Sequence, residues 1–163
     1  MEIRLENVQT DYFKVSSFSL SAKEKLLIKG PSGSGKTTFL HLLAGLYRPS
    51  SGSVSWDGKS LAEYSEHALS ELRRTRMGLI FQNLNLLSYL TATENIELSG
   101  ASSADARILL TTVGLGEKIT KRTQNLSLGE QQRVAVARVL AQKAEVILAD
   151  EPTSSLEIGR AHV

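Results

Sequence analysis

The segment Gly30–Thr37 constrains the fold of this chain more than any other feature. It reads Gly-Pro-Ser-Gly-Ser-Gly-Lys-Thr and fits the pattern G-x-x-x-x-G-K-[ST] at every position. A mainly apolar stretch precedes it at residues 25–29, and apolar residues at helical spacing follow from Gly35. We therefore expect a strand, a tight loop and a helix in that order. Such a loop turns successive backbone N–H groups toward one anion, so the sequence predicts a phosphate-binding loop in an α/β domain.

Two side chains at the end of this loop suit nucleotide triphosphate chemistry. Lys36 can reach the β- and γ-phosphates, and the Thr37 hydroxyl can ligate Mg²⁺. The following helix presents its positive end to the same anion. The alternative is a glycine- and serine-rich surface turn, which the preceding strand and the following helix argue against. By itself the motif indicates only a P-loop nucleotide triphosphatase.

Composition narrows the class of protein. The 163 residues contain 41% hydrophobic and 22% charged residues, as an ordinary globular domain does. The net charge of +2 gives no reason to expect nucleic acid or an acidic membrane surface as a partner. There is no cysteine, hence no disulfide or thiolate metal site. No apolar run approaches the ~20 residues that span a bilayer, so we expect any membrane role to come through a partner.

The hydrophobic pattern predicts strands that alternate with helices, which favours an α/β fold with a partly parallel sheet. Residues 83–124 contain helical segments without a strand and are expected to form a helical insert. The expected strands include residues 3–5, 18–20, 25–29, 53–56, 77–81 and 146–149. One expected helix begins at residue 35, and the others cover residues 68–74, 93–98, 103–113 and 127–143.

Two acids follow the apolar strand expected at 146–149. Asp150 at the strand end could hold Mg²⁺ through water, and Glu151 beside it could polarise an attacking water molecule. The alternative for these two residues alone is a solvated acidic turn. Gln82 likewise closes an apolar strand, where its amide oxygen could reach a metal, although a single glutamine is unremarkable in most proteins.

The segment Leu126–Arg133 opens the longest expected helix. Ser127, Gly129 and the bare amides of a helix start make a second site for an anion. As a local motif, a plain N-cap with Glu130 in a capping box explains the same residues.

In combination, these segments resemble the ATP-binding cassette (ABC) ATPase family. The phosphate loop resembles its Walker A motif, Gln82 its Q-loop, Leu126–Gln132 its signature, 146–151 its Walker B motif and 150–156 its D-loop. The resemblance covers about residues 2–157, and kinases and G proteins lack such a signature. It implies a P-loop NTPase fold of the ABC ATPase type, with a mixed sheet, a helical subdomain around 83–124 and a missing C-terminal part.

The resemblance also implies a role for each matching residue. Glu151 would be the general base, Thr37 and Gln82 would ligate Mg²⁺, and Asp150 would lie behind the metal. Tyr12 would stack on adenine, with Phe13 as the alternative and a simple edge aromatic as the non-functional reading. The expected ATP-binding residues further include Gly30, Ser32, Gly33, Ser34, Gly35, Lys36 and Thr38, and, for the ATP of an opposing subunit, Ser127, Gly129 and Glu130.

The signature departs from the family pattern at two positions. Leu128 stands where the family usually has glycine, and we expect it to weaken or reshape the contact with the opposing phosphate. Glu130 stands where glutamine is usual, and this is a familiar variant.

The resemblance predicts an ATPase subunit that pairs with a second copy and a transmembrane permease at the cytoplasmic face of the cell membrane. Segments 71–74, 81–87 and 90–95 resemble the lipoprotein-release, macrolide-export and cell-division branch, which favours export. The alternatives are a cell-division or signalling ATPase, a soluble ABC protein of translation or DNA repair, and a non-catalytic nucleotide-binding module.

The end of the chain differs from the family. The family continues with a switch histidine, and none of His41, His67 and His162 fits that role. Residues 158–163 are the translation of one frame of a common sequencing adaptor (ATC GGA AGA GCA CAC GTC), although a natural short tail is the alternative. We therefore expect residues 1–157 to be a partial nucleotide-binding domain, inactive by itself as an ATPase, followed by a non-native tail at 158–163.

Overall fold

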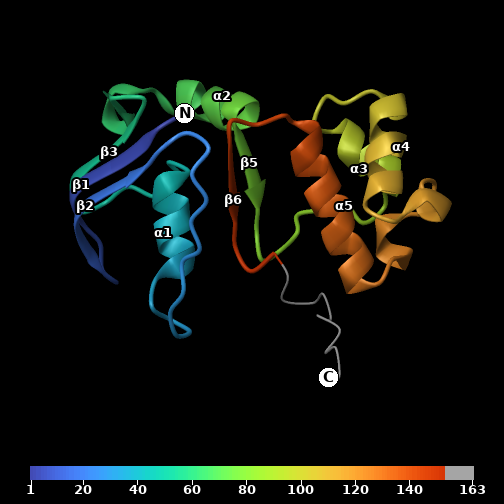
Figure 1. Ribbon diagram of the computed structural model, residues 1–163, viewed down its shortest axis with the longest axis horizontal. Coiled ribbons are helices and arrows are strands. Elements are labelled where there is room, and N and C mark those ends of the chain that lie inside the picture. The colour runs from blue at the N-terminus through green and yellow to red at the C-terminus, as the bar shows by residue number, and fades with distance from the viewer. Residues whose placement is uncertain (153–163) are drawn as a thin grey trace. The chain divides into compact units, whose positions relative to one another are not determined.

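The computed structural model describes residues 1–152, which form two compact units, Met1–Met77 and a second unit from Gly78 onward. Each unit has secondary structure of its own (Figure 1). The tail expected at 158–163 and the D-loop residues 153–156 lie outside the described residues. The mixture of strands and helices is the predicted α/β class.

An antiparallel sheet organises the first unit, with strand order β2-β1-β3-β4. Its central strand β1 places Ile3 opposite Leu20 of β2 and opposite Trp56 of β3. Ile3, Leu5 and Val8 are buried, and an irregularity between Glu6 and Gln9 explains why the alternation shifts by one residue. The strands are β1 (Ile3–Gln9), β2 (Lys14–Leu20), β3 (Ser51–Trp56) and β4 (Lys59–Ser60).

Two helices complete the first unit, α1 (Lys36–Leu43) and α2 (Glu66–Arg76), with the 3-10 turn η1 (Leu61–Glu63) between β4 and α2. Leu42 and Leu43 of α1 are buried, and the Trp56 indole N–H donates to the Leu43 carbonyl oxygen at 3.0 Å. Burial of a large aromatic ring with its polar atom satisfied is a strong anchor between strand and helix.

The prediction of a strand at residues 25–29 is wrong. This segment carries no strand, and Leu26 and Leu27 are 50% and 75% exposed. An apolar run forms a strand only where a neighbour completes its backbone hydrogen bonds, and within residues 1–152 no strand pairs with it.

The strand β5 (Met77–Ile80) begins at the last residue of the first unit, continues into the second and pairs there with β6 (Val146–Ala149). Both strands run in the same direction in Figure 1, so this pair is the parallel part of the fold. The Asp150 N–H donates to the Ile80 carbonyl oxygen at 2.9 Å and extends the pairing past the end of β6.

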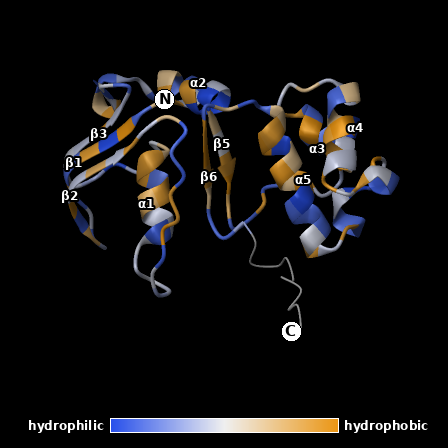
Figure 2. Ribbon diagram, viewed as in Figure 1, coloured by the Kyte–Doolittle hydropathy of each residue, from blue (hydrophilic) through white to orange (hydrophobic). Residues whose placement is uncertain are grey.

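The long helix α5 (Leu128–Ala141) follows residues 83–124, the segment that we expect to form a helical insert. That segment contains the helices α3 (Ala92–Glu97) and α4 (Ser103–Thr112) and the 3-10 turns η2 (Gly116–Lys118) and η3 (Thr123–Asn125). Within it, strand-like pairing is limited to a single bridge between Thr91 and Arg122. The C-terminal part of α5 is apolar and its first turns are polar (Figure 2). The buried cluster between the helices consists of Ala92, Ile96, Ala106, Leu110, Leu115, Leu126, Val134 and Ala137.

A buried amide joins this helical layer to the segment that follows β5. The Asn95 side chain on α3 is fully buried. Its Oδ1 accepts from the Leu87 N–H at 2.8 Å, and its Nδ2 donates to the carbonyl oxygens of Leu87 and Thr91, each at 3.0 Å. The Thr123 hydroxyl also donates to the Leu87 oxygen at 2.9 Å. Because buried backbone groups need partners, Asn95 fixes the path of residues 87–91.

We predict that Asn95→Ala destabilises the helical unit by about 1–3 kcal/mol, because it removes the acceptor of the Leu87 N–H and one donor from each of the Leu87 and Thr91 carbonyl oxygens. Urea unfolding followed by circular dichroism measures the change. Asn125→Ala, at an exposed asparagine of η3, is the control and should lie within about 0.5 kcal/mol of the parent chain. Equal unfolding midpoints for the two variants would contradict the assigned role of Asn95.

Candidate functional site

The phosphate loop leads directly into α1. Gly33 and Gly35 adopt left-handed backbone conformations with φ of +78° and +86°, which side chains with a Cβ rarely adopt. Gly35 is the N-cap residue of α1, and no side chain caps this helix. Backbone N–H groups at a helix start have no intrahelical acceptor, and such a start commonly binds an anion.

The Lys36 side chain forms hydrogen bonds within the phosphate loop. Its Nζ donates to the carbonyl oxygens of Gly30 at 2.9 Å and Pro31 at 2.8 Å. A Cβ added at Gly30 would meet Ser34 Oγ at 2.7 Å, so the loop closes tightly at that point. Among the other expected contacts, Ser32 and Thr37 are exposed and Thr38 is half-buried at the start of α1. The loop has the chemistry to hold phosphate oxygens: a cation, hydroxyl groups and helix-start amides.

The β1–β2 turn places two aromatic rings beside the phosphate loop. The buried Thr10 hydroxyl accepts from the N–H groups of Tyr12 at 3.2 Å and Phe13 at 3.1 Å and so shapes the turn. A Cβ added at Gly35 would lie 2.8 Å from Phe13 Cδ1 and 3.1 Å from Tyr12 Cβ. The turn therefore contacts the loop itself.

The two aromatic candidates for adenine stacking differ in their surroundings. Phe13 is half-buried and packs edge-on against Phe39 of α1, with 5.7 Å between ring centroids. The same Phe39 ring contacts Phe18 of β2 at 5.2 Å. Tyr12 is 63% exposed. Of the two, Tyr12 has the ring surface that a flat base could cover.

The second unit brings Gln82 and two acids to one edge. Gln82 follows β5 and is exposed, whereas Asp150 and Glu151 follow β6. Because the carboxyl ends of paired parallel strands meet at one edge, the pairing brings these residues together. Asp150 is buried, and Glu151 is exposed with a φ of +47°. A non-glycine residue at positive φ is uncommon and costs conformational energy.

The side chains that were expected to bind Mg²⁺ have suitable chemistry when each is taken by itself. The Thr37 hydroxyl, the Gln82 amide oxygen and the Asp150 carboxylate are hard oxygen donors of the kind that Mg²⁺ prefers. Thr37 belongs to the first unit, and Gln82 and Asp150 belong to the second.

The signature segment begins α5 with a complete capping box. Ser127 Oγ accepts from the Glu130 N–H at 3.3 Å, and Glu130 Oε2 accepts from the Ser127 N–H at 2.8 Å. Gly129 is half-buried in the first turn, and Leu128 has a helical backbone with a 58% exposed side chain. The backbone therefore does not require glycine at 128, and the effect of Leu128 on a phosphate contact stays a prediction.

Glu130 also forms an ion pair with Lys118, the last residue of η2. The hydrogen bond from Lys118 and, next, that from the Ser127 N–H lower the pKa of Glu130 to about 2. Sequence reasoning did not find Lys118, because nothing in the local pattern connects a residue of η2 with a carboxylate on the next helix.

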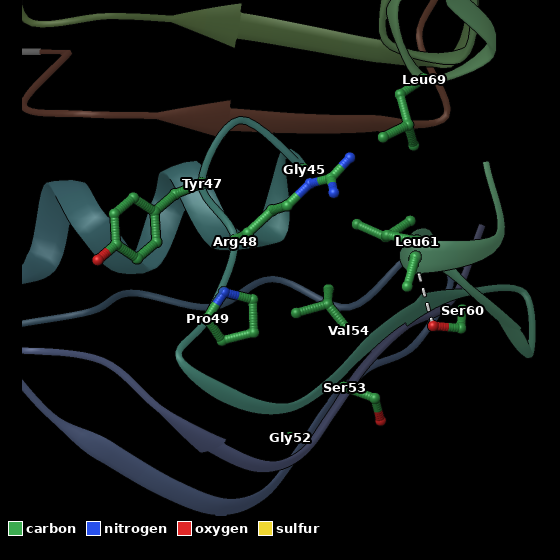
Figure 3. A pocket seen from close by; sticks show the side chains of 11 residues that line it. Gly45, Tyr47, Arg48, Pro49, Gly52, Ser53, Val54, Ser60, Leu61 and Leu69 are labelled. Atoms are coloured by element: carbon green, nitrogen blue, oxygen red, sulfur yellow. Dashed lines mark hydrogen bonds between the residues drawn. The ribbon is translucent and has the colours of Figure 1, made fainter. Parts of the chain in front are cut away.

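A cavity in the first unit lies away from these motifs. It is lined by β3, η1 and the segment after α1, including Arg48, Pro49, Val54 and Leu61 (Figure 3). Its volume of about 160 Å³ is below the ~300–1,000 Å³ typical of small-molecule pockets. None of the expected ATP-binding residues lines it.

Among residues 1–152, none of the helices has the length and apolar character needed to cross a bilayer.

Comparisons with known proteins agree on one family. The family model described as "ABC transporter" matches residues 13–154. An uncharacterized ABC transporter ATP-binding protein of Thermotoga maritima is 42% identical, over 94% of this chain and 69% of that protein. The macrolide export ATP-binding/permease protein MacB of Bdellovibrio bacteriovorus is 39% identical, over 94% of this chain and 25% of that protein.

Solved structures show the same fold. The dimeric, post-hydrolysis structure of the ATP-binding cassette MJ0796 bound to ADP and Pi matches with a TM-score of 0.82 and 34% identity, over 96% of this chain and 76% of that chain. A bacterial Atm1-family ABC exporter with ATP bound matches with a TM-score of 0.82 and 29% identity, over 96% of this chain and 30% of that chain.

We predict a specific pH dependence from Glu130. Because its pKa falls from near 4.5 in the unfolded chain to about 2 in the folded one, the ionised carboxylate stabilises the fold above pH ~4.5, and this stabilisation is lost as the pH falls toward 2. The difference in urea midpoint between the parent chain and Glu130→Gln should therefore be largest at neutral pH and shrink on acidification. Glu117→Gln, at an exposed glutamate of η2, is the control and should show no such trend. A constant difference down to pH 2 would contradict the assignment.

Proposed function

The chain belongs to the ABC transporter ATP-binding family, and from this premise we propose that it binds and hydrolyses ATP to power a membrane transporter of the export type. The observation that carries the proposal is the start of α1 without a side-chain cap, which follows Gly33 and Gly35 at positive φ and the inward-bonded Lys36. The motif order along the chain supports the same reading.

ATP binding would use groups that now satisfy one another. The Lys36 ammonium, held by the carbonyl oxygens of Gly30 and Pro31, would transfer its hydrogen bonds to the β- and γ-phosphates. The first-turn amides of α1 would face the same phosphates, and the Tyr12 ring would cover the adenine. The remaining phosphate contacts would come from residues assigned by their place in the Walker A motif, namely Gly30, Ser32, Ser34 and Thr38.

Hydrolysis would depend on the acids after β6. Glu151 would accept a proton from the attacking water as its oxygen bonds to the γ-phosphorus, while the bond to the bridging oxygen of ADP breaks and releases phosphate. Thr37 and Gln82 would hold Mg²⁺, with Asp150 behind it. Mg²⁺, when bound, neutralises charge on the β- and γ-phosphates. Asp150 is held in place by its own N–H bond to Ile80.

A second subunit would complete each site. Ser127, Gly129 and Glu130 at the start of α5 would contact the ATP held by the opposing copy, and Leu128 would reshape this contact. The dimeric form of the MJ0796 cassette supports a homodimer. Closure of two subunits around ATP would then act on a permease at the cytoplasmic face of the cell membrane.

Export is favoured by the relatives, because one is a macrolide export ATP-binding/permease protein and one structure is an exporter. A cell-division or signalling ATPase of the same branch is the second candidate. Neighbouring genes separate the two: a permease with a periplasmic fusion partner indicates export. A soluble ABC protein of translation or DNA repair would have no permease gene beside it.

The extent of the domain belongs to the proposal too. We treat residues 1–157 as part of a longer nucleotide-binding domain, with its helical subdomain at about 83–124, and residues 158–163 as non-native. The chain spans 69% of the Thermotoga relative and 76% of the MJ0796 cassette. Exposed Leu26 and Leu27 suit a sheet that needs further strands, so we expect the present chain to hydrolyse ATP poorly by itself.

We predict that Lys36→Ala in the complete gene product abolishes ATP binding, measured by equilibrium binding of a fluorescent ATP analogue. The lysine supplies the single positive side chain inside the loop, and no neutral side chain replaces its charge on the phosphates. Lys25→Ala, at an exposed lysine of the same unit, is the control and should bind as the parent does. Unchanged affinity and turnover for Lys36→Ala would refute the phosphate-loop assignment.

We predict that Glu151→Gln retains ATP binding but lowers turnover by about 10²-fold or more, because the amide keeps the shape and loses the basicity. Trapped ATP should then hold two subunits together, which light scattering detects. Adding Lys36→Ala to this variant should remove the dimer. A hydrolytically normal Glu151→Gln variant would exclude Glu151 as the base.

A further inference from the structure

A series of contacts connects Lys118 of η2, through Glu130, with Ser127, the N-cap residue of α5. Lys118 pairs with Glu130 through one carboxylate oxygen, Oε1. The other oxygen, Oε2, accepts from the Ser127 N–H at 2.8 Å, and Ser127 Oγ accepts from the Glu130 N–H at 3.3 Å. The Glu130 side chain is 13% exposed, so this arrangement is shielded from much of the solvent.

These contacts decide which groups at the start of α5 stay available. The Ser127 N–H is engaged by Glu130, and the Ser127 oxygen already accepts one hydrogen bond. The remaining donors are the Ser127 hydroxyl proton and the N–H groups of Leu128 and Gly129, which have no intrahelical acceptor. Holding Glu130 therefore holds the donors that would face a phosphate.

The positive charge of Lys118 also has an electrostatic effect at the start of α5. A carboxylate beside a phosphate-binding helix start repels the anion that the site must accept. A cation within hydrogen-bond distance offsets that negative charge, so the electrostatic potential at the helix start is then set mainly by its backbone N–H groups. The usual glutamine of the family needs no such partner, whereas Glu130 does.

Resting on the proposed function, we propose that Lys118 is a positioning residue for the signature: through its ion pair with Glu130 it fixes Ser127 and neutralises Glu130, so that the start of α5 accepts the γ-phosphate of ATP bound by the second subunit. Lys118 itself touches no nucleotide. If Lys118 only stabilised the helical unit, its substitution would weaken ATP-dependent dimerisation only as far as it lowers the stability of that unit.

The first experiment measures ATP-dependent dimerisation of the complete gene product in the Glu151→Gln background. Lys118→Met should weaken dimerisation about tenfold, as the loss of one charge-assisted contact does. Lys118→Arg should restore it, and Lys121→Met, at an exposed lysine three residues away, should leave it unchanged. ATP affinity of the monomer should stay unchanged in all three, because the phosphate loop lies in the other unit.

The second experiment asks whether Lys118 acts through Glu130. In a Glu130→Gln, Glu151→Gln background, Lys118→Met should have little further effect on dimerisation. Carbon-13 NMR of the carboxyl groups gives an independent measure, since Lys118→Met should raise the pKa of Glu130 from about 2 toward its usual range. If Lys118→Met is too unstable to purify, Lys118→Gln takes its place.

Three results would overturn the inference while the proposed function stands. Dimerisation of Lys118→Met equal to that of Lys121→Met is the first. The second is an equal loss in the Glu130→Gln background, and the third is a loss that tracks the unfolding midpoint and is not rescued by arginine. Failure of the Glu151→Gln parent to form any ATP-dependent dimer would refute the proposed function itself, a different outcome that is seen before Lys118 is changed.

Discussion

The unsatisfied N–H groups at the start of a helix are the constraint that the two motif-bearing helices, α1 and α5, meet in different ways. Four N–H groups at each helix start lack intrahelical acceptors, and a buried or partly buried helix end needs something to accept from them. The helix α1 begins at a glycine without any side-chain cap. The helix α5 begins at Ser127 with a full capping box and a lysine behind it. The two helix starts therefore differ: a side-chain cap satisfies part of the start of α5, whereas α1 has no such cap.

The polar groups inside the helical unit explain how a short insert keeps a defined geometry. Asn95 and Thr123 satisfy the backbone of the segment after β5, and the Arg138 guanidinium donates to the carbonyl oxygens of Leu84 and Asn85, each at 2.8 Å. These bonds hold the chain that follows Gln82 against α3 and α5. Each bond is worth little in net free energy, but leaving its partner buried and unpaired is costly. The contacts therefore specify one path for the loop.

The sequence was informative wherever function or secondary structure depends on neighbouring residues. The start of a helix directly after the glycine-rich loop, the capped start of α5 and the helices within residues 83–124 agree with the sequence prediction, because glycine spacing, capping residues and apolar periodicity are local signals. The strand at 25–29 was predicted wrongly, since its apolar residues describe a buried strand but cannot supply the partner that makes one. Lys118 was missed for the related reason that its partner is on another element. The roles of Tyr12, Gln82 and Glu151 stay predictions.

What the sequence determined by itself is the family and the local features that identify it: a glycine-rich loop before a lysine, acids after an apolar strand, and a serine that caps a helix. These follow from conformational preferences of single residues, which need no knowledge of the rest of the chain. Only the tertiary structure decided which groups are engaged and which are left over. Lys36 rests on loop carbonyls, Phe13 is held by Phe39 while Tyr12 is exposed, and Glu130 is neutralised by Lys118. These outcomes depend on distances between elements far apart in sequence, and packing sets those distances.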